Sequence, residues 1–184
     1  TRQGVNCVSS TSSLPLKLKT LEFIQRDANY GRLASRIVED RASAEARTLV
    51  LFEWTRQHIR DTPDGFPIID DHIWHIIVRG YGEDDQKADV FTTLATYAGV
   101  PSFFVQSEPP VSLAWIDRKW AVFDVANGIG FRNERGELAS AEELARNPRI
   151  VRAIAAGRMY RGRPYDSYFT GFRPPTPPGI LRPE

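Results

Sequence analysis

Apolar residues recur every three or four positions in several parts of the chain, the spacing of one face of an α-helix. Over residues 16–38 the pattern predicts one or two short helices, because Gly31 interrupts it. A further helix is expected from Ser43, a good N-terminal cap, to about Arg60. Its apolar face is broad enough to predict that most of this helix is buried, with Trp54 in the core.

A central helix is predicted from near Asp84 to Ala98, where apolar residues again follow the helical period. Gly99 and Pro101 are placed to end it. Three acidic residues, Glu83 to Asp85, crowd its start, and the side chain of Asp84 is expected to cap the helix.

The period then changes to that of strands. The segments SFFVQ, VSLAWI and KWAVFDV are three strand candidates, and Asp117 and Arg118 form the expected turn between the last two. One more helix is predicted from Ser140, with acids in its first turn. Helices followed by an antiparallel sheet predict an α+β fold in which helices pack on the sheet.

Both ends of the chain differ from the middle. Residues 1–15 are polar and rich in serine and are expected to be loose; a single domain is expected over 16–160. Residues 161–184 hold six of the thirteen prolines and are expected to be extended. The aromatic residues of this tail predict that 164–181 is ordered and docked on the domain, since disordered tails are usually poor in aromatics.

Composition is that of an ordinary soluble globular protein, with 41% hydrophobic and 26% charged residues and a formal net charge of +1. Nucleic acid is therefore not an expected partner, and no apolar run is long enough to predict a membrane span. The single cysteine, Cys7, excludes an internal disulfide. Any export signal would lie outside these 184 residues, so the compartment stays open.

Positive charge is concentrated toward the C-terminus. Residues 147–184 carry seven arginines and only two acidic residues. This region could meet an acidic partner, or it could pack along the acidic surface of its own domain.

The segment RGYGEDDQKADVFTTLATYAGVPSFFV, together with WIDRKWAVFDV, resembles the core of the transglutaminase-like superfamily, which has a papain-like fold. In that family a glycine-rich turn precedes a catalytic cysteine at the start of a buried helix. A histidine lies on the next strand, and an Asp or Asn on the strand after it. The matching features, which fall in order over residues 46–128, are Gly80, Gly82, Asp85, Gln86, Ala88, the Gly99–Pro101 turn, Lys119, Trp120 and Asp124.

Two of the three catalytic positions depart from the family pattern. By this register Asp84 stands where the family has its cysteine nucleophile, and a carboxylate is a poor acyl-transfer nucleophile at neutral pH. All three histidines precede Asp84, so the strand at 109–115 offers no general base. Only Asp124 of the triad is kept. The resemblance therefore implies a catalytically inactive domain that binds a protein or peptide, or serves as a scaffold, without a cofactor.

Other chemistry stays open at this point. Asp84 and Asp124 would face each other in the family geometry, and paired carboxylates can perform acid–base hydrolysis. His72 and His75, three residues apart, are weak candidates for a metal site near Asp84. An enzyme with rebuilt chemistry is thus the alternative. The residues expected to line a binding groove are Trp74, Tyr81, Asp84, Trp115 and Asp124.

Overall fold

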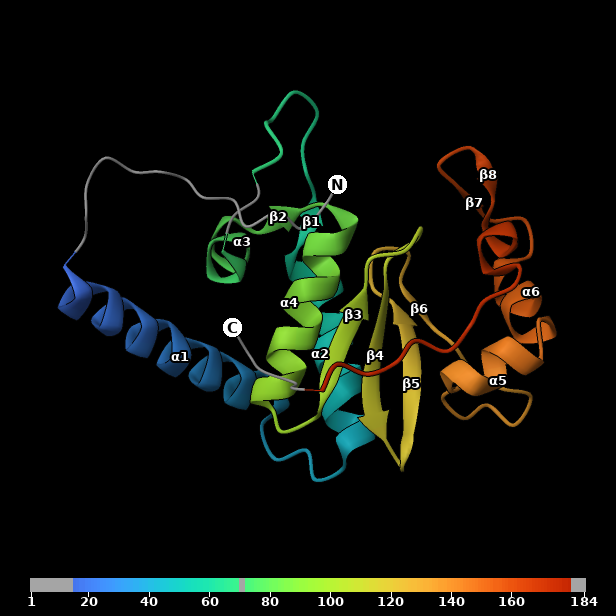
Figure 1. Ribbon diagram of the computed structural model, residues 1–184, viewed down its shortest axis with the longest axis horizontal. Helices are drawn as coiled ribbons and strands as arrows, with labels where there is room; N and C mark the ends of the chain where they lie inside the picture. The colour runs from blue at the N-terminus through green and yellow to red at the C-terminus, as the bar shows by residue number, and fades with distance from the viewer. Residues whose placement is uncertain (1–14, 70–71, 180–184) are drawn as a thin grey trace.

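The computed structural model describes residues 15–69 and 72–179. At its centre is an antiparallel sheet with the strand order β3-β4-β5-β6 (Figure 1). Its strands are β3 (Ser102–Val105), β4 (Val111–Ile116), β5 (Lys119–Asp124) and β6 (Ile129–Gly130). Asp117 and Arg118 form the turn between β4 and β5, as expected, both with positive φ. The predicted α+β fold is confirmed.

Both faces of this sheet are covered, which explains why β4 and β5 read as nearly continuous apolar runs. Ala114 and Phe123 point into one hydrophobic cluster, and Leu113 and Val122 point into another. Side chains alternate between the faces of a strand, so each strand contributes to both cores.

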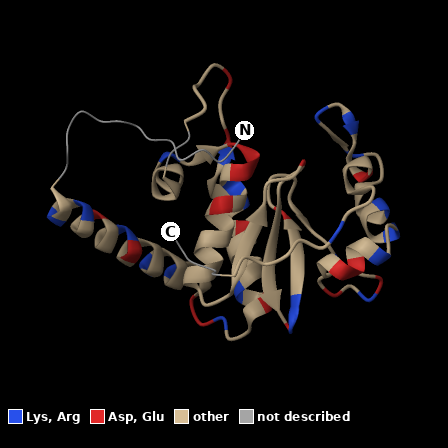
Figure 2. Ribbon diagram, in the orientation of Figure 1, with Lys and Arg blue, Asp and Glu red and all other residues tan. Residues whose placement is uncertain are grey.

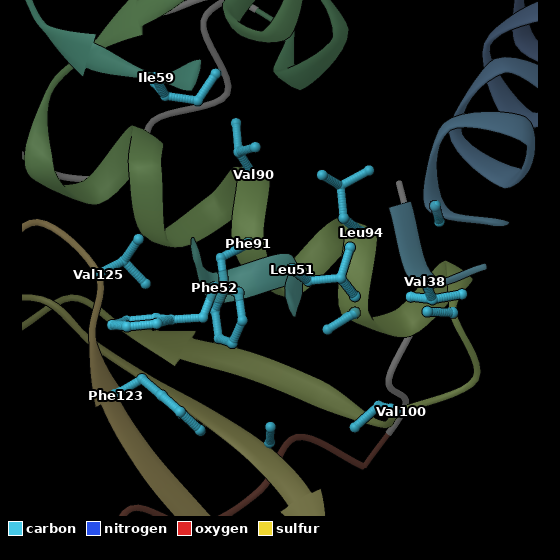
Figure 3. Close-up of a cluster of buried hydrophobic side chains, with 14 of the residues drawn as sticks. Val38, Leu51, Phe52, Ile59, Val90, Phe91, Leu94, Val100, Phe123 and Val125 are labelled. Carbon is cyan, nitrogen blue, oxygen red and sulfur yellow. The ribbon is translucent and has the colours of Figure 1, made fainter. Parts of the chain in front are cut away.

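The first core joins the sheet to the N-terminal helices: α1 (Leu16–Val38), α2 (Ala44–His58), α3 (Ile73–Arg79) and α4 (Asp84–Tyr97). The helix α4 is the most deeply buried of them, with Val90, Phe91 and Leu94 fully enclosed. Figure 3 shows Phe91 beside Phe52 of α2 and Phe123 of β5, and the ring centroids of Phe91 and Phe123 are 5.4 Å apart. This packing fixes the start of α4 relative to the end of β5.

The second core joins the opposite face of the sheet to the C-terminal part of the chain (Figure 1). Its elements are α5 (Ala141–Arg146), α6 (Arg149–Ala155), the hairpin of β7 (Met159–Tyr160) and β8 (Arg163–Pro164), and the 3-10 helix η1 (Tyr165–Phe169). Tyr165 and Phe169 are buried in this core, so it contains residues on both sides of position 160.

Several local predictions are confirmed. Ser43 caps α2 by accepting a hydrogen bond from the amide of Ala46, and Ser140 caps α5 in the same way with Glu143.

A two-residue parallel pairing of β1 (Arg60–Asp61) with β2 (Tyr81–Gly82) closes the loop before α4. Buried Lys87 of α4 forms an ion pair with Asp61 of this pairing.

Other local predictions are wrong. Gly31 does not interrupt the first helix, which is continuous over 23 residues. Trp54 is only partly buried, because it lines a groove of about 320 Å³ between α1 and α2. In the C-terminal segment Tyr165–Phe169 form a 3-10 helix where an extended chain was expected. The expected docking is confirmed for the aromatics, which all lie in or against the second core up to Phe172, but residues 173–179 are mostly exposed. Residues 180 and 181, like 1–14, lie outside the described residues.

Candidate functional site

The candidate site lies where α4 begins, after a turn that needs its glycines. Gly80 has φ +74°, a left-handed conformation that favours glycine. At Gly82 a Cβ would lie 2.9 Å from Oε1 of Gln86. That same oxygen accepts hydrogen bonds from the amide of Glu83 and from Arg79. The glycine turn therefore lets the backbone pass close to the side chains that hold the helix start.

Asp84 is the first residue of α4, and the cap position is Glu83, so the prediction that Asp84 caps the helix is wrong. The carboxylate of Asp84 instead accepts a hydrogen bond from the hydroxyl of Tyr160 at 2.7 Å. Arg161 lies beside it, with Nη2 3.8 Å from the same Oδ2, and also pairs with Glu108. The side chain of Asp84 is thus held by the β7–β8 hairpin.

Asp124, at the end of β5, is fully buried. Its Oδ2 accepts hydrogen bonds from the hydroxyl of Tyr165 at 2.6 Å and from the side-chain amide of Asn127 at 2.9 Å. Its Oδ1 accepts from the backbone amide of Asn127, also at 2.9 Å. Burial raises the pKa of Asp124, and the three hydrogen bonds only partly offset this. Burial and the Asp124 charge likewise raise the pKa of Tyr165.

The two carboxylates are near neighbours in space. The charge of Asp84 contributes to the raised pKa of Asp124, and both charges raise the pKa of Tyr160 after burial, the largest cause. Each carboxylate nevertheless accepts a hydrogen bond from a different tyrosine, Asp84 from Tyr160 and Asp124 from Tyr165. We call the segment of residues 160–165 that provides these bonds the tyrosine clasp. The clasp thus engages one oxygen of each carboxylate, Oδ2 of Asp84 and Oδ2 of Asp124.

Other predicted groove residues do not converge on Asp84 and Asp124. Trp115 is exposed and contacts Trp120 edge to face. Trp120 is four residues from Asp124 along β5, a separation of about 13 Å. Trp74 packs against Tyr30 in the first core, with 5.4 Å between ring centroids. Only Tyr81 lies near the start of α4, half-buried between Arg79 and Phe66.

The weak metal candidates have other contacts. Nδ1 of His72 is 3.2 Å from the hydroxyl of Tyr30, and the rings of His72 and His75 are 6.3 Å apart. In the part of the chain that the structure describes, no three His, Cys, Asp or Glu side chains are grouped to hold a metal ion. Nor does any helix of this part combine the length and apolarity of a membrane span.

The clasp residues Tyr160, Arg161 and Tyr165 are the functional residues that sequence reasoning missed. The aromatic content of the C-terminal segment indicated docking but not the carboxylates that its tyrosines contact. Asp84 is 76 residues from Tyr160 in the chain, and Asp124 is 41 residues from Tyr165. Three of the C-terminal arginines also contact their own chain: Arg158 donates to the carbonyl of Asn127, Arg161 pairs with acids, and Arg163 lies over the ring of Tyr168. Figure 2 shows further basic residues along α6, whereas α5 carries acidic residues in its first turn.

Comparisons with known proteins support the fold. Neither a family model nor a curated protein matches the sequence. A solved structure from Cytophaga hutchinsonii, assigned as a cysteine protease, is similar with a TM-score of 0.50 and 15% identity, over 65% of this chain and 45% of that one. The present chain therefore spans less than half of that protein's length.

Two further solved structures are similar at a lower level. One, from Parabacteroides distasonis and assigned as a protease, has a TM-score of 0.44 and 14% identity, over 58% of this chain and 25% of that one. The other is described as a TGase, with a TM-score of 0.43 and 15% identity, over 87% of this chain and 45% of that one. At such identities the first likeness shows that this chain shares the fold of that structure, and it says nothing of activity.

Proposed function

We propose that this protein is a catalytically inactive transglutaminase-like domain that binds a protein or peptide partner. The observation that carries the proposal is the state of the two triad positions. Asp84 and Asp124 each accept a hydrogen bond from a tyrosine of the same chain. No thiol or imidazole follows in the sequence to replace the missing nucleophile and base.

The alternative of a carboxylate enzyme is less well supported. A general base must come within hydrogen-bonding distance of the proton that it removes. Asp124 is fully buried and already accepts three hydrogen bonds. Asp84 is more accessible, but Tyr160 and Arg161 lie on its carboxylate. A substrate would have to displace the clasp before it reached Asp124 or the Oδ2 atom of Asp84.

A partner would bind instead to the exposed apolar surface beside Tyr81. Phe66 and Ile68 are 55% and 69% exposed, and the ring of Phe66 contacts Tyr81. Arg79 and Gln86 hold this surface against α4 by donating to the carbonyl of Ile69. Apolar side chains held by a polar framework are typical of sites that bind other proteins.

Turnover assays test the first half of the proposal. Amine incorporation into a glutamine peptide and peptide cleavage are measured for the wild type, for Cys7→Ser, and for Tyr160→Phe with Arg161→Ala, which frees Asp84. We expect all three to match the buffer blank. Turnover that survives Cys7→Ser and is lost in Asp84→Asn would establish a carboxylate enzyme and refute the proposal.

Peptide selection tests the second half. Peptides selected from a displayed library on the immobilised protein are expected to lose binding with Phe66→Asp. The matched control is Met159→Asp, at a side chain that is 61% exposed on β7. Selected peptides that bind Phe66→Asp as well as the wild type, or a selection that yields none, would contradict a binding role for this surface.

A further inference from the structure

The helix α1 presents large apolar side chains to solvent. Its C-terminal half packs on the domain through Tyr30, Ala34 and Val38, while its N-terminal half extends away from the domain (Figure 1). Leu21 and Ile24 on this half are 60% and 56% exposed. Nothing in the described residues accounts for these two side chains, which folding of the domain leaves in water.

Leu21 and Ile24 belong to a regular stripe along the helix, whereas the exposed Leu16, Leu18 and Phe23 lie on other sides of it. Residues 21, 24, 28, 31 and 35 alternate spacings of three and four, the pattern of a coiled-coil seam. Ser35 and Gly31 each follow a buried residue, which places the stripe about 100° around the helix from the core-facing side. The stripe is bulky at its N-terminal end and small at its C-terminal end, with Ala28, Gly31 and Ser35.

Gly31 is the residue that the monomer does not explain. It lies in the interior of α1, where glycine is among the least favourable residues, and its φ is not positive. A Cβ built on it would meet no atom within 4 Å. Among the described residues neither the backbone conformation nor a neighbour requires glycine here, and the open position admits the close approach of another molecule.

We propose that α1 pairs antiparallel with α1 of a second copy of this chain. In the register that alternates bulky and small layers, Leu21 of each copy lies over Gly31 of the other, and Ile24 lies over Ala28. A symmetric pair repeats both layers, so that four bulky side chains enter four open positions. The paired stripe runs from residue 17 to residue 35, a length of about 27 Å.

Charge and shape agree with this arrangement. Long side chains of a helix lean toward its N-terminus, so Lys17 of one copy extends toward Glu39, the residue that follows α1, in the other. The two domains attach to the C-terminal halves, on a different side of each helix from the stripe, and therefore stand at opposite ends of the pair. A parallel pair would set bulky against bulky residues and leave the small positions unfilled.

Sedimentation of the full chain tests the pairing. We expect a dimer whose population rises with protein concentration. In Leu21→Asp and in Gly31→Leu the dissociation constant of the dimer should be at least about tenfold larger, while the far-ultraviolet circular dichroism spectrum should be unchanged. Gly31→Leu adds no charge and fills the position that Leu21 needs. The control is Met159→Asp, at an equally exposed apolar residue on β7, which should dimerise as the wild type does.

Disulfide trapping tests the orientation in a Cys7→Ser background. Mixed Leu21→Cys and Gly31→Cys chains should form a mixed disulfide, while neither variant alone should cross-link. A monomer at every concentration up to about 1 mM, a dimer that Leu21→Asp leaves intact, or cross-linking of each variant with itself would overturn the proposal. A partner other than a second copy would give the first of these results.

Discussion

Replacement of Tyr165 by phenylalanine should destabilise the protein by about 2 kcal/mol. The ring is 1% exposed and would keep its packing against Phe169, so the substitution removes only the hydroxyl. That hydroxyl donates to the buried carboxylate of Asp124 at 2.6 Å. A hydrogen bond to a charged group contributes about 1.5–3 kcal/mol, and Asp124 would keep only the two bonds from Asn127.

Thermal denaturation measures this loss, which corresponds to a fall of about 4–8 °C in Tm for a chain of this size. Tyr168→Phe is the matched control, because its hydroxyl donates to a neutral acceptor, the carbonyl of Tyr160, and about 1 kcal/mol is expected. The bond from Tyr165 lowers the pKa of Asp124, so the difference from wild type should shrink as pH falls through that pKa. An unchanged Tm, or a difference that does not depend on pH, would refute the reasoning.

Three further predictions concern the same region. Asp84→Ala removes the acceptor for the Tyr160 hydroxyl and a favourable charge at the start of α4. It should therefore lower the free energy of unfolding, measured by urea denaturation, by about 1–2 kcal/mol. An unchanged free energy would mean that the Tyr160 hydroxyl does not hold Asp84. Because the folded pKa of Asp124 is raised, its contribution to stability is fully present below the ordinary value near 4 and is lost as pH rises. Wild type should therefore lose stability relative to Asp124→Asn as pH rises from about 4 through the folded pKa, and the opposite trend would contradict burial as the cause. Gly80→Ala forces a side chain into a left-handed conformation and should cost about 1–2 kcal/mol, whereas a neutral effect would show that the turn can relax.

The parts of the fold that follow from local rules were predictable. The caps at Ser43 and Ser140, the central helix and the three strands each depend on residues within a few positions of one another. Gly31 misled the prediction because a single glycine costs about 1 kcal/mol, which the packing of a 23-residue helix readily offsets. Trp54 misled it because helical spacing gives the apolar arc but not the depth of each member.

The candidate site was predictable only in part. The glycine turn, Asp84 and Asp124 could be located because they occupy consecutive features of one motif. Their tyrosine partners could not, because a hydroxyl at position 160 or 165 has no local preference for a carboxylate far away in the sequence. Only the packing of the second core, which buries Tyr165 beside β5, brings these groups together. Long-range polar pairs of this kind depend on the completed fold.

Amide hydrogen exchange at residues 158–172 of the full chain tests most directly the claim that the tyrosine clasp is a fixed part of the domain. The amide of Tyr165 donates to the carbonyl of Arg158 at 3.0 Å. The amide of Trp115 in β4 donates to the carbonyl of Pro101 at 2.8 Å. If the clasp is fixed, the Tyr165 amide should exchange nearly as slowly as the Trp115 amide, since both would open only with the core. Exchange of the Tyr165 amide at the rate of a free peptide, while Trp115 stays protected, would show that the clasp is open in solution and leaves Asp84 and Asp124 accessible.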